Sequence, residues 1–433
     1  MSTDRIHDFL GIGVGPFNLG LACLTAPIEG LDGVFLERKA DVDWHPGMLI
    51  EGTTMQVPFM ADLVTLADPT SPFSFLNYLK QQGRIYPFYI RESFFQLRAE
   101  FQDYLRWAAA RLDNLRFETE VTSVEWDSGR GVYAVHSVSP GGANVDFARR
   151  LVLGTGTPPW LPLAVQGLEG ETVVHASQYL ASRDRLKECG SITVVGSGQS
   201  AAEIYRDLLE DIGTGYRLNW VTRSPRFFPL EYTKLTLEMT SPDYVDYFNA
   251  LPAARRDELN AGHKGLYKGI NADDINEIYD LLYRKKFELG EVPTRLFTNC
   301  TVEKAAAGER LTLGIRQHEQ DREFELDTEG LVLATGYSHR PPAFLDGIRD
   351  RLRFDATGRL AARRDYSVDA AADGEVFVQN AELATHGFVT PDLGMAAYRN
   401  SWIIRSLTGR EVYPIERRIA FQEFAAPDED AAT

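Results

Sequence analysis

Two segments of this 433-residue chain repeat one pattern, in which a short apolar run leads through a glycine-rich turn into a helix pattern. The first segment spans residues 8–22 and the second spans residues 192–203. Glycines at such a turn let backbone N–H groups approach a bound pyrophosphate at the positive end of the helix. Each segment therefore predicts a dinucleotide-binding turn, and we expect the chain to form two such domains.

The remainder of the chain continues the alternation of apolar runs and helix patterns. Runs of this kind are typical of parallel strands that are covered on both faces. We predict strands at 9–12, 33–36, 151–153, 192–195, 218–221 and 331–333, and helices that include 94–111 and 201–210. The alternation indicates an α/β fold with two Rossmann-like domains, because strands joined by helices form doubly wound parallel sheets.

The first turn carries features that select between dinucleotides. Its glycines are Gly11, Gly13 and Gly15, and Pro16 takes the place of the usual third glycine. Proline is tolerated there because the first residue of a helix needs no partner for its N–H. The following strand ends in Glu37, whose carboxylate accepts hydrogen bonds from ribose hydroxyls and repels a 2′-phosphate. The unit therefore favours FAD or NAD, and the alternative is a merely structural glycine turn.

The second turn contains Gly196, Gly198, Gln199 and Ser200, and the strand that follows it ends at Arg223. A guanidinium at this position can hold a 2′-phosphate through two hydrogen bonds. This unit therefore favours NADPH. The alternative is a surface arginine that happens to follow a strand.

One unit for FAD and one for NADPH predict a flavin-dependent oxidoreductase. Segments 154–156 and 334–336 (Ala334, Thr335 and Gly336) resemble the motifs at which such flavoproteins cross between domains, and the second is assigned to cofactor binding. We predict an FAD-binding domain at 1–165 and 330–433 and an NADPH-binding domain at 166–224 and 290–329. Residues 225–289, which are rich in charge and tyrosine, are predicted to form a small helical substrate-binding region.

The amino-acid composition argues against several other classes of protein. The three cysteines, Cys23, Cys189 and Cys300, lie far apart, which argues against a disulfide scaffold, a metal site or a local redox dithiol. A net charge of −17 argues against nucleic acid or an anionic membrane as the main partner. No apolar run approaches the roughly 18 residues of a membrane span, and the N-terminus lacks a signal-peptide pattern. We expect a cytoplasmic protein.

A reduced flavin can pass electrons to a disulfide, to an acceptor protein or to oxygen. The scattered cysteines leave no obvious dithiol for the first route. Reaction with oxygen needs a closed, dry pocket and no dedicated cysteine. Elimination therefore favours a monooxygenase, although an acceptor-protein reductase stays open at this point.

Several segments resemble the N-hydroxylating flavin monooxygenases of siderophore biosynthesis, which act on lysine, ornithine or diamines. The matching segments are 44–49, 55–59, 62–65, 68–79, 101–109, 196–203, 334–337 and 385–387. They cover nearly the whole chain in order. The resemblance implies that NADPH reduces FAD, that O2 forms a C4a-hydroperoxyflavin, and that a neutral primary amine attacks its distal oxygen. It also implies a homo-oligomer, a tetramer in relatives.

The resemblance also assigns individual residues. Trp44, His45 and Gln56 match positions that line the flavin, and His386 and Gly387 match a C-terminal segment that returns to it. An alternative makes His45 and Gln56 a hydrogen-bonded structural pair, and His386 is given no catalytic part. Two residues are placed at the catalytic centre, namely Gln56 and Asn271, the latter as a contact for the reacting amine.

Two positions depart from the pattern of amino-acid hydroxylases. Ala61 stands where those enzymes have a lysine that pairs with the substrate carboxylate, and Gly394 replaces a serine near the α-carbon. A buried carboxylate without a cation costs several kcal/mol, so an amino-acid substrate is disfavoured. We therefore predict a diamine, putrescine or cadaverine, with Asp246 as the acid for its second ammonium group. For Asp246 the alternative is a surface acid on a helix.

The resulting prediction is an FAD- and NADPH-dependent diamine N-monooxygenase that makes an N-hydroxydiamine for a hydroxamate siderophore. The alternative within the class is an L-lysine N6- or L-ornithine N5-monooxygenase with a rearranged carboxylate site. Outside the class, an NADPH-dependent flavoprotein reductase or a flavin-binding structural protein stays open.

Overall fold

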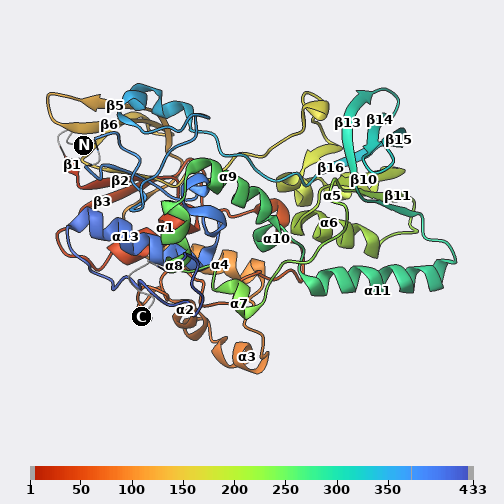
Figure 1. The fold of residues 1–433 in the computed structure, drawn as a ribbon, viewed down its shortest axis with the longest axis horizontal. Coiled ribbons are helices and arrows are strands. Elements are labelled where there is room, and N and C mark those ends of the chain that lie inside the picture. The colour runs from red at the N-terminus through yellow and green to blue at the C-terminus, as the bar shows by residue number, and fades with distance from the viewer. Residues whose placement is uncertain (1–4, 372, 428–433) are drawn as a thin grey trace.

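The two glycine turns lie in separate five-stranded parallel sheets. The computed structural model, which describes residues 5–371 and 373–427, builds one lobe on each sheet. Figure 1 shows the first lobe around β2 and β3 and the second around β10, β11 and β16. This confirms the predicted α/β fold with two dinucleotide-binding domains.

The first sheet is buried on both faces. Its strands, in spatial order, are β17 (Val376–Val378), β8 (Leu151–Leu153), β2 (Phe9–Ile12), β3 (Gly33–Leu36) and β4 (Leu115–Arg116). Alternate side chains point to opposite faces. Phe9 and Phe35 therefore pack against the helices α1 (Pro16–Thr25), α4 (Arg98–Ala109) and α13 (Ala396–Thr408).

The opposite face, which includes Leu10 and Val34, packs against a second sheet and a 3-10 segment. These are β1 (Ile6–His7), β7 (Gly142–Ala148), β6 (Val132–Ser139), β5 (Glu120–Asp127) and η4 (Ala343–Arg351). Burial on both faces explains why the strands of the first sheet read as continuous apolar runs.

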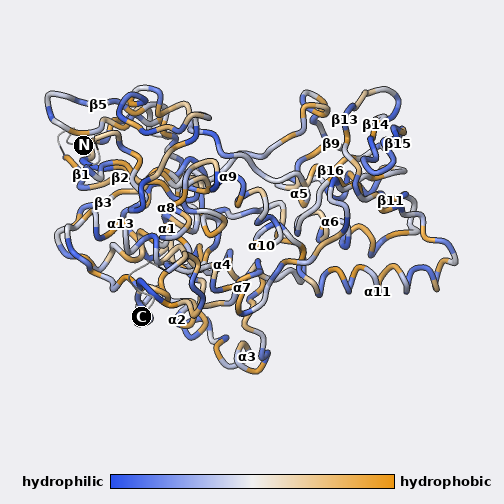
Figure 2. The backbone as a smooth tube through the Cα atoms, viewed as in Figure 1, coloured by the Kyte–Doolittle hydropathy of each residue, from blue (hydrophilic) through white to orange (hydrophobic). Residues whose placement is uncertain are grey.

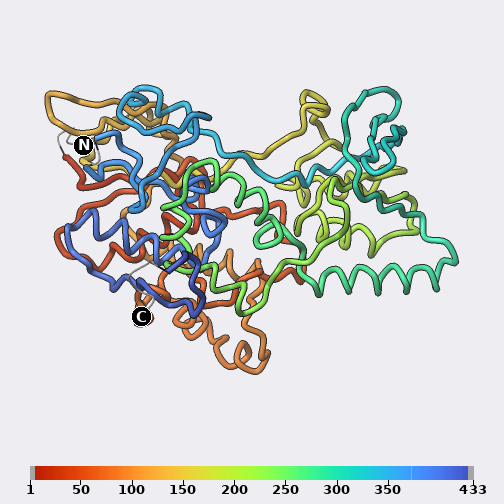
Figure 3. Tube along the Cα trace, viewed as in Figure 1, coloured from red at the N-terminus to blue at the C-terminus, as the bar shows by residue number. Residues whose placement is uncertain are grey.

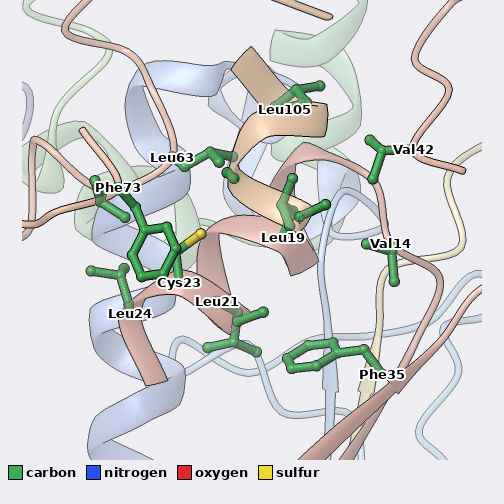
Figure 4. Packing of buried hydrophobic residues seen from close by; sticks show 14 of the residues in the cluster. Val14, Leu19, Leu21, Cys23, Leu24, Phe35, Val42, Leu63, Phe73 and Leu105 are labelled. Atoms are coloured by element: carbon green, nitrogen blue, oxygen red, sulfur yellow. The ribbon is translucent and has the colours of Figure 1, made fainter. Parts of the chain in front are cut away.

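The helical layer over the first sheet is closely packed. Figure 4 shows Cys23 of α1 among Leu24, Phe73 and Leu63, and its thiol side chain is 1% exposed. All three cysteines are free. Cys23 therefore acts as a small apolar core residue. Around this layer lie α2 (Phe75–Gln81), α3 (Ile85–Ile90), α12 (Leu383–His386), η1 (Pro46–Met48), η5 (Gly387–Val389) and η6 (Leu393–Met395).

The second lobe repeats the arrangement. Its sheet has the order β12 (Thr294–Phe297), β11 (Arg217–Val221), β10 (Ser191–Val195), β16 (Gly330–Leu333) and β9 (Val173–His175). Helix α6 (Gln199–Glu210) packs on one face. The other face meets an antiparallel sheet of β13 (Cys300–Ala307), β14 (Leu311–Gln317) and β15 (Arg322–Thr328). Shorter elements are α5 (Tyr179–Lys187), η2 (Leu163–Val165) and η3 (Ala176–Gln178).

Two expected domain boundaries are wrong by a few residues. Strand β16 begins at residue 330 and pairs with β10, so the second lobe extends to Leu333 rather than ending at 329. Val165 is buried with Leu313 of β14, which places it in the second lobe as well. Residues 1–4, 372 and 428–433, which the expected first domain includes, lie outside the described residues.

Region 225–289 is helical as predicted, but its core is divided between the lobes. Its helices are α7 (Lys234–Leu237), α8 (Pro242–Ala250), α9 (Ala253–Gly262), α10 (Lys264–Tyr267) and α11 (Ala272–Leu289). Phe248 of α8 packs with Phe388 of the first lobe, whereas Ile278 of α11 packs with Ile204 of the second. In Figure 2, α11 mixes apolar and polar residues along its length. No helix within the described ranges is long and apolar enough to cross a membrane.

The predicted helix at 94–111 begins later than expected, at Arg98. The residues before it form backbone hydrogen bonds with an earlier loop. Phe59 N–H donates to the carbonyl of Phe94 at 2.8 Å, and Met55 N–H donates to that of Gln96 at 2.9 Å. These bonds hold the segment in an extended conformation, which a helix pattern in the sequence does not reveal.

Two chain segments cross between the lobes side by side (Figure 3). Trp160 N–H donates to the carbonyl of Gly336 at 2.9 Å, and Ser338 N–H donates to that of Pro158 at 3.0 Å. The short antiparallel pairing explains the proline-rich sequence, because Pro158 contributes only its carbonyl to it.

A buried ion pair also joins the lobes. Arg98 of α4 donates to both carboxylate oxygens of Glu203 in α6, at 2.6 and 2.7 Å. The side chains are 12% and 2% exposed. Burial raises the pKa of the Glu203 carboxyl, and the Arg98 charge opposes that shift. Such a bidentate contact fixes the direction of both side chains as well as their distance.

We predict that Arg98→Ala lowers the free energy of unfolding by about 3–5 kcal/mol, because the Glu203 carboxylate stays buried without its cation. Urea denaturation followed by circular dichroism measures this loss. Arg284→Ala is the matched control, since its pair with Glu210 is more than half exposed and should contribute about 1 kcal/mol or less. Equal losses in the two variants would contradict the prediction.

Candidate functional site

A cavity of about 430 Å³ lies between the lobes and the helical region. Its wall brings together residues that are far apart in the sequence. The predicted site residues that line it are Pro16, Trp44, His45, Gln56, Gln199 and Ser200. Tyr337 of the second crossing segment lines it too. The cavity is therefore the candidate active site.

The first glycine turn has the geometry of a pyrophosphate cradle. Gly13 has a φ of 88°, and a Cβ on it would lie 2.5 Å from the carbonyl oxygen of Gly154. Gly15 faces open space and precedes Pro16, the first residue of α1. Gly11 differs from its assigned place at the cofactor, because it lies inside β2 with its α-carbon against the Phe35 ring.

Glu37 is fixed at the tip of β3 by two backbone groups. Its carboxylate accepts hydrogen bonds from the N–H of Val14 at 2.7 Å and from that of Lys39 at 2.9 Å. Each oxygen keeps a further lone pair for a ribose hydroxyl. The turn and the acid together fit the adenosine diphosphate half of a dinucleotide that lacks a 2′-phosphate.

The second turn sits at the junction with the crossing segments. Gly196 approaches the carbonyl of Ala334 too closely for any side chain, and Gly198 precedes the first residue of α6. The Thr335 hydroxyl donates to the carbonyl of Trp160, and Gly336 pairs with the same residue through its own carbonyl. The protein groups around Thr335 and Gly336 therefore hold the crossing segments together.

Three cations gather near the end of β11. Arg223 is exposed and has no hydrogen-bond or ion-pair partner among the residues described. Burial, together with the charges of Lys264 and Arg223, lowers the pKa of the Lys268 ammonium. This cluster can bind a phosphate dianion. The two lysines were missed from the sequence, although their spacing of four residues in a helix pattern places them on one face.

The Gln199 side chain connects the two lobes and the helical region. Its amide oxygen accepts from Gln56 Nε2 at 3.2 Å and from the backbone N–H of Asn271 at 2.8 Å. Its amide nitrogen donates to Glu203 at 2.7 Å and also to Asp274 of α11. The structure thus brings together three residues that the sequence analysis placed at the site.

Asn271 reaches this network through its backbone only. Its side-chain oxygen accepts from the N–H of Asp273 at 2.8 Å and caps the first turn of α11. Its side chain does not line the cavity. The expected contact between Asn271 and the reacting amine therefore has no support in this geometry, and a helix cap explains the residue.

His45 faces the cavity in a left-handed backbone conformation, with a φ of 49°. Its Nδ1 lies 3.4 Å from the Tyr337 hydroxyl, and its ring contacts Trp44 edge to face. Burial, with the charges of Arg98 and Lys39, lowers the pKa of the imidazole to about 4. The ring is therefore neutral at physiological pH. The alternative of a His45–Gln56 pair is not what the structure has.

His386 is packed inside the first lobe. It is 1% exposed, and its ring stacks on Tyr366 with centroids 4.4 Å apart. Burial and the charge of Arg364 lower its pKa to about 3. Its predicted place beside a flavin is therefore not supported, since no face of the ring is open to a ligand. The following Gly387 turns the chain so that Phe388 forms part of the cavity wall.

Neither substituted position contacts the cavity directly. Ala61 is 4% exposed and is not among the residues that line the cavity. Gly394 is likewise not among the lining residues, and its backbone N–H donates to Asp392 Oδ1 at 2.7 Å. The residues at these two positions therefore supply no direct contact to the cavity.

Asp246 is outside the cavity, contrary to expectation. Helix α8 turns Tyr244, Val245 and Phe248 toward the first lobe, so Asp246 faces the other way. Its side chain is 57% exposed and forms an ion pair with Arg364. The helix periodicity that placed Asp246 near the substrate does not determine which neighbour each face meets.

Two other acids, Glu231 and Asp392, line the cavity, and Tyr232 lines it as well. Sequence reasoning missed all three residues. Asp392 stands two residues before Gly394, one of the positions where the chain departs from the family pattern. That proximity in the sequence was the signal that could have identified Asp392 as a candidate site residue.

Comparisons with known proteins agree with this geometry. The family model for L-lysine 6-monooxygenase/L-ornithine 5-monooxygenase matches residues 5–339. A putrescine N-hydroxylase of Shewanella oneidensis is 51% identical over 97% of this chain and 84% of its own length. The FAD-bound cadaverine monooxygenase of the desferrioxamine pathway of Erwinia amylovora superimposes with a TM-score of 0.95, at 56% identity over 98% and 100% of the two chains.

The ornithine N-hydroxylase of Kutzneria sp. 744, solved with reduced FAD, NADP+ and L-ornithine, superimposes with a TM-score of 0.86 at 30% identity, covering 93% of this chain and 99% of its own. The similarity to these proteins extends over both lobes and the cavity between them. The chain therefore belongs to the L-lysine 6-monooxygenase/L-ornithine 5-monooxygenase family.

Proposed function

We propose that this protein is an FAD- and NADPH-dependent monooxygenase that N-hydroxylates one primary amine of an aliphatic diamine, putrescine or cadaverine, for hydroxamate siderophore biosynthesis. The observation that carries the substrate class is the charge of the cavity. Arg98 is committed to Glu203 and His45 is neutral, so the described wall offers no free cation to a substrate carboxylate. The relatives named for putrescine and cadaverine support the same choice.

The residues of the first lobe fit FAD. Gly13 and Gly15, with the N-terminus of α1, would hold its pyrophosphate, and Glu37 would hold its ribose. Gln56 and the Trp44–His45 pair would face its ring system from the cavity wall. When bound and reduced, FAD supplies the electrons that activate O2 for transfer of one oxygen atom to the amine nitrogen.

The residues of the second lobe fit NADPH. Gly196, Gly198 and Ser200 would hold its pyrophosphate at the N-terminus of α6. Arg223 with Lys264 and Lys268 would hold its 2′-phosphate. Gln199, at the same helix end, lines the cavity that the first lobe also faces, so the two cofactors would meet there.

The cavity wall prepares the amine for reaction. An ammonium ion has no lone pair, so the amine that reacts must be neutral. Met48, Met55, Val57 and Phe388 give the wall apolar surface, which disfavours the charged form and lowers the pKa of an amine placed against it. The same surface excludes water from the oxygen-transfer step. The Gln56–Gln199 amide pair adds polar groups without adding charge.

We also propose a cytoplasmic homo-oligomer, a tetramer as the family resemblance implies. Helix α11 carries a row of aromatic side chains at intervals of four residues, which lie on one face of a helix. They are Tyr279, Tyr283 and Phe287, with exposed fractions of 68%, 71% and 87%. Large exposed apolar patches mark contact surfaces between proteins, so this row is the proposed subunit contact.

The first prediction for this proposal concerns the substrate. Hydroxylamine formation coupled to NADPH oxidation should be faster with putrescine or cadaverine than with ornithine or lysine, because the latter place an unpaired carboxylate in the cavity. Parallel assays of the four amines measure this. Faster turnover of ornithine or lysine would contradict the diamine assignment. NADPH oxidation with an artificial acceptor, independent of amine, would instead indicate a reductase.

The second prediction concerns the cofactor. Arg223→Ala should lower the ratio of kcat/KM for NADPH to that for NADH by roughly 10- to 100-fold, as expected for loss of a charged hydrogen bond to the 2′-phosphate. Arg217→Ala is the matched control, because it removes an exposed arginine from the opposite end of the same strand. An unchanged ratio in Arg223→Ala would show that the phosphate binds elsewhere.

The third prediction concerns assembly. Phe287→Asp should shift the protein toward smaller species in light scattering coupled to size-exclusion chromatography, because it buries a charge in the proposed contact. Leu163→Asp, at an 85% exposed residue on η2, serves as the control. A wild-type monomer, or an unchanged mass for Phe287→Asp, would contradict the proposed contact.

A further inference from the structure

The cavity carries negative charge that no cation among the described residues neutralises. Its acids are Glu231 and Asp392, and neither forms an ion pair with a described residue. The cation whose charge acts on Asp392 is Arg399, which is already paired with another acid. Arg399 pairs with Glu382 at 3.0 Å and donates to the carbonyl of Thr390 at 2.6 Å. A cationic ligand would therefore find an unpaired carboxylate in the wall.

Asp392 is held in a single orientation by its own backbone. One carboxylate oxygen, Oδ1, accepts the N–H of Gly394 at 2.7 Å and caps η6. The other oxygen, Oδ2, has no partner among the described residues. Burial raises the pKa of this carboxyl, and the Gly394 hydrogen bond and the Arg399 charge oppose the shift. An arriving ammonium group would offset that cost of burial.

Gly394 and Asp392 are sterically linked. A Cβ at position 394 would lie 3.0 Å from Asp392 Oδ1, closer than side chains normally approach. A serine there would push against the carboxylate. The glycine that replaces the family serine is therefore matched to the acid two residues before it. Glycine in place of serine at position 394 thus removes a hydroxyl group and leaves space around the Asp392 carboxylate.

Tyr232 lines the same cavity as Asp392 and is close enough to be affected by its charge. Burial and the nearby Asp392 charge raise the pKa of its phenol, so the hydroxyl stays protonated. Its ring packs edge to face on Phe95, with centroids 6.3 Å apart, which holds it in place. An ammonium ion next to Asp392 could also contact the face of this ring or its hydroxyl oxygen. The Asp392 carboxylate and the Tyr232 ring therefore fit an alkylammonium ion, and they provide no positive charge for a substrate carboxylate.

Glu231 is the weaker of the two acids. It is exposed, whereas Asp392 is part-buried. Solvent screens an exposed charge strongly, so its contact with an ammonium contributes little. Its carboxylate also lies over Gly265, at the side of the cavity formed by the helical region.

We propose that Asp392 binds the second ammonium group of the diamine, the one that is not hydroxylated, with Tyr232 as its neighbour. This assignment rests on the proposed diamine N-hydroxylase function and gives that site its substrate specificity. Asp392 takes the place that the sequence analysis gave to Asp246, namely the acid that pairs with the second ammonium group of the diamine. The length of the diamine then has to match the span from Asp392 to the Gln56–Gln199 end of the cavity.

The test is Asp392→Asn, which keeps an oxygen to cap η6 and removes the charge. Hydroxylamine formation is measured with cadaverine and with pentan-1-amine, which has the same chain but no second amine. We expect kcat/KM for cadaverine to fall by roughly 10- to 100-fold, and that for pentan-1-amine to stay within about threefold. Asp346→Asn, an exposed acid on η4, is the matched control for loss of one charge. FAD content and NADPH-driven flavin reduction report on folding.

The outcomes separate this assignment from the proposed function. A wild-type enzyme that makes no hydroxylamine from either diamine refutes the proposed function itself. A wild-type enzyme that does so, while Asp392→Asn keeps its preference for cadaverine over pentan-1-amine, overturns the assignment of Asp392. An equal or larger loss of that preference in Glu231→Gln overturns it as well, in favour of the exposed acid.

Discussion

The contact between Arg98 and Glu203 sets the relation between the two lobes, and the cavity depends on it. The arginine comes from the helix that covers the first sheet, and the glutamate comes from the helix that follows the second glycine turn. Because the pair is bidentate and nearly buried, it holds α6 at a defined position against the first lobe. Gln199, one turn earlier on α6, is thereby brought to Gln56 and to the start of α11. The Gln56–Gln199 contact in the cavity wall thus depends on the Arg98–Glu203 ion pair, which has no assigned part in the reaction itself.

The charge inside the cavity follows from what the surrounding structure leaves unpaired. Arg98 lines the cavity and Arg399 is buried near Asp392, and both are neutralised by buried glutamates. Asp392 has no such partner, and the glycine at 394 gives it room. A cavity with a free carboxylate and no free cation selects a substrate with a second positive charge. Substrate class is therefore decided by how the arginines in and near the wall are paired as much as by the acid that the wall presents.

The parts of the fold that could be predicted are those set by near neighbours in the chain. Six strands of the two sheets, the proline at the start of α1 and the acid at the tip of β3 follow from local sequence, because each needs only its own segment to be recognised. Three other predictions, for Asp246, His386 and the boundary at residue 330, do not hold. Each depends on which distant segment packs against the residue, and periodicity carries no information about that. The late start of α4 has the same cause, since backbone pairing with residues 55–59 overrides its helix pattern.

The sequence by itself determined that this protein has two dinucleotide-binding turns, an acid suited to a ribose, a cation suited to a phosphate, and no lysine or serine where amino-acid hydroxylases have them. These features are local, because a turn, a strand tip and a missing side chain can be recognised without knowing their neighbours. Only the tertiary structure decided which acid lines the cavity and which forms an ion pair at the surface. Asp246 and Asp392 are alike as residues. They differ because helix α8 turns Asp246 toward Arg364, whereas Asp392 lines the cavity and forms no ion pair with a described residue.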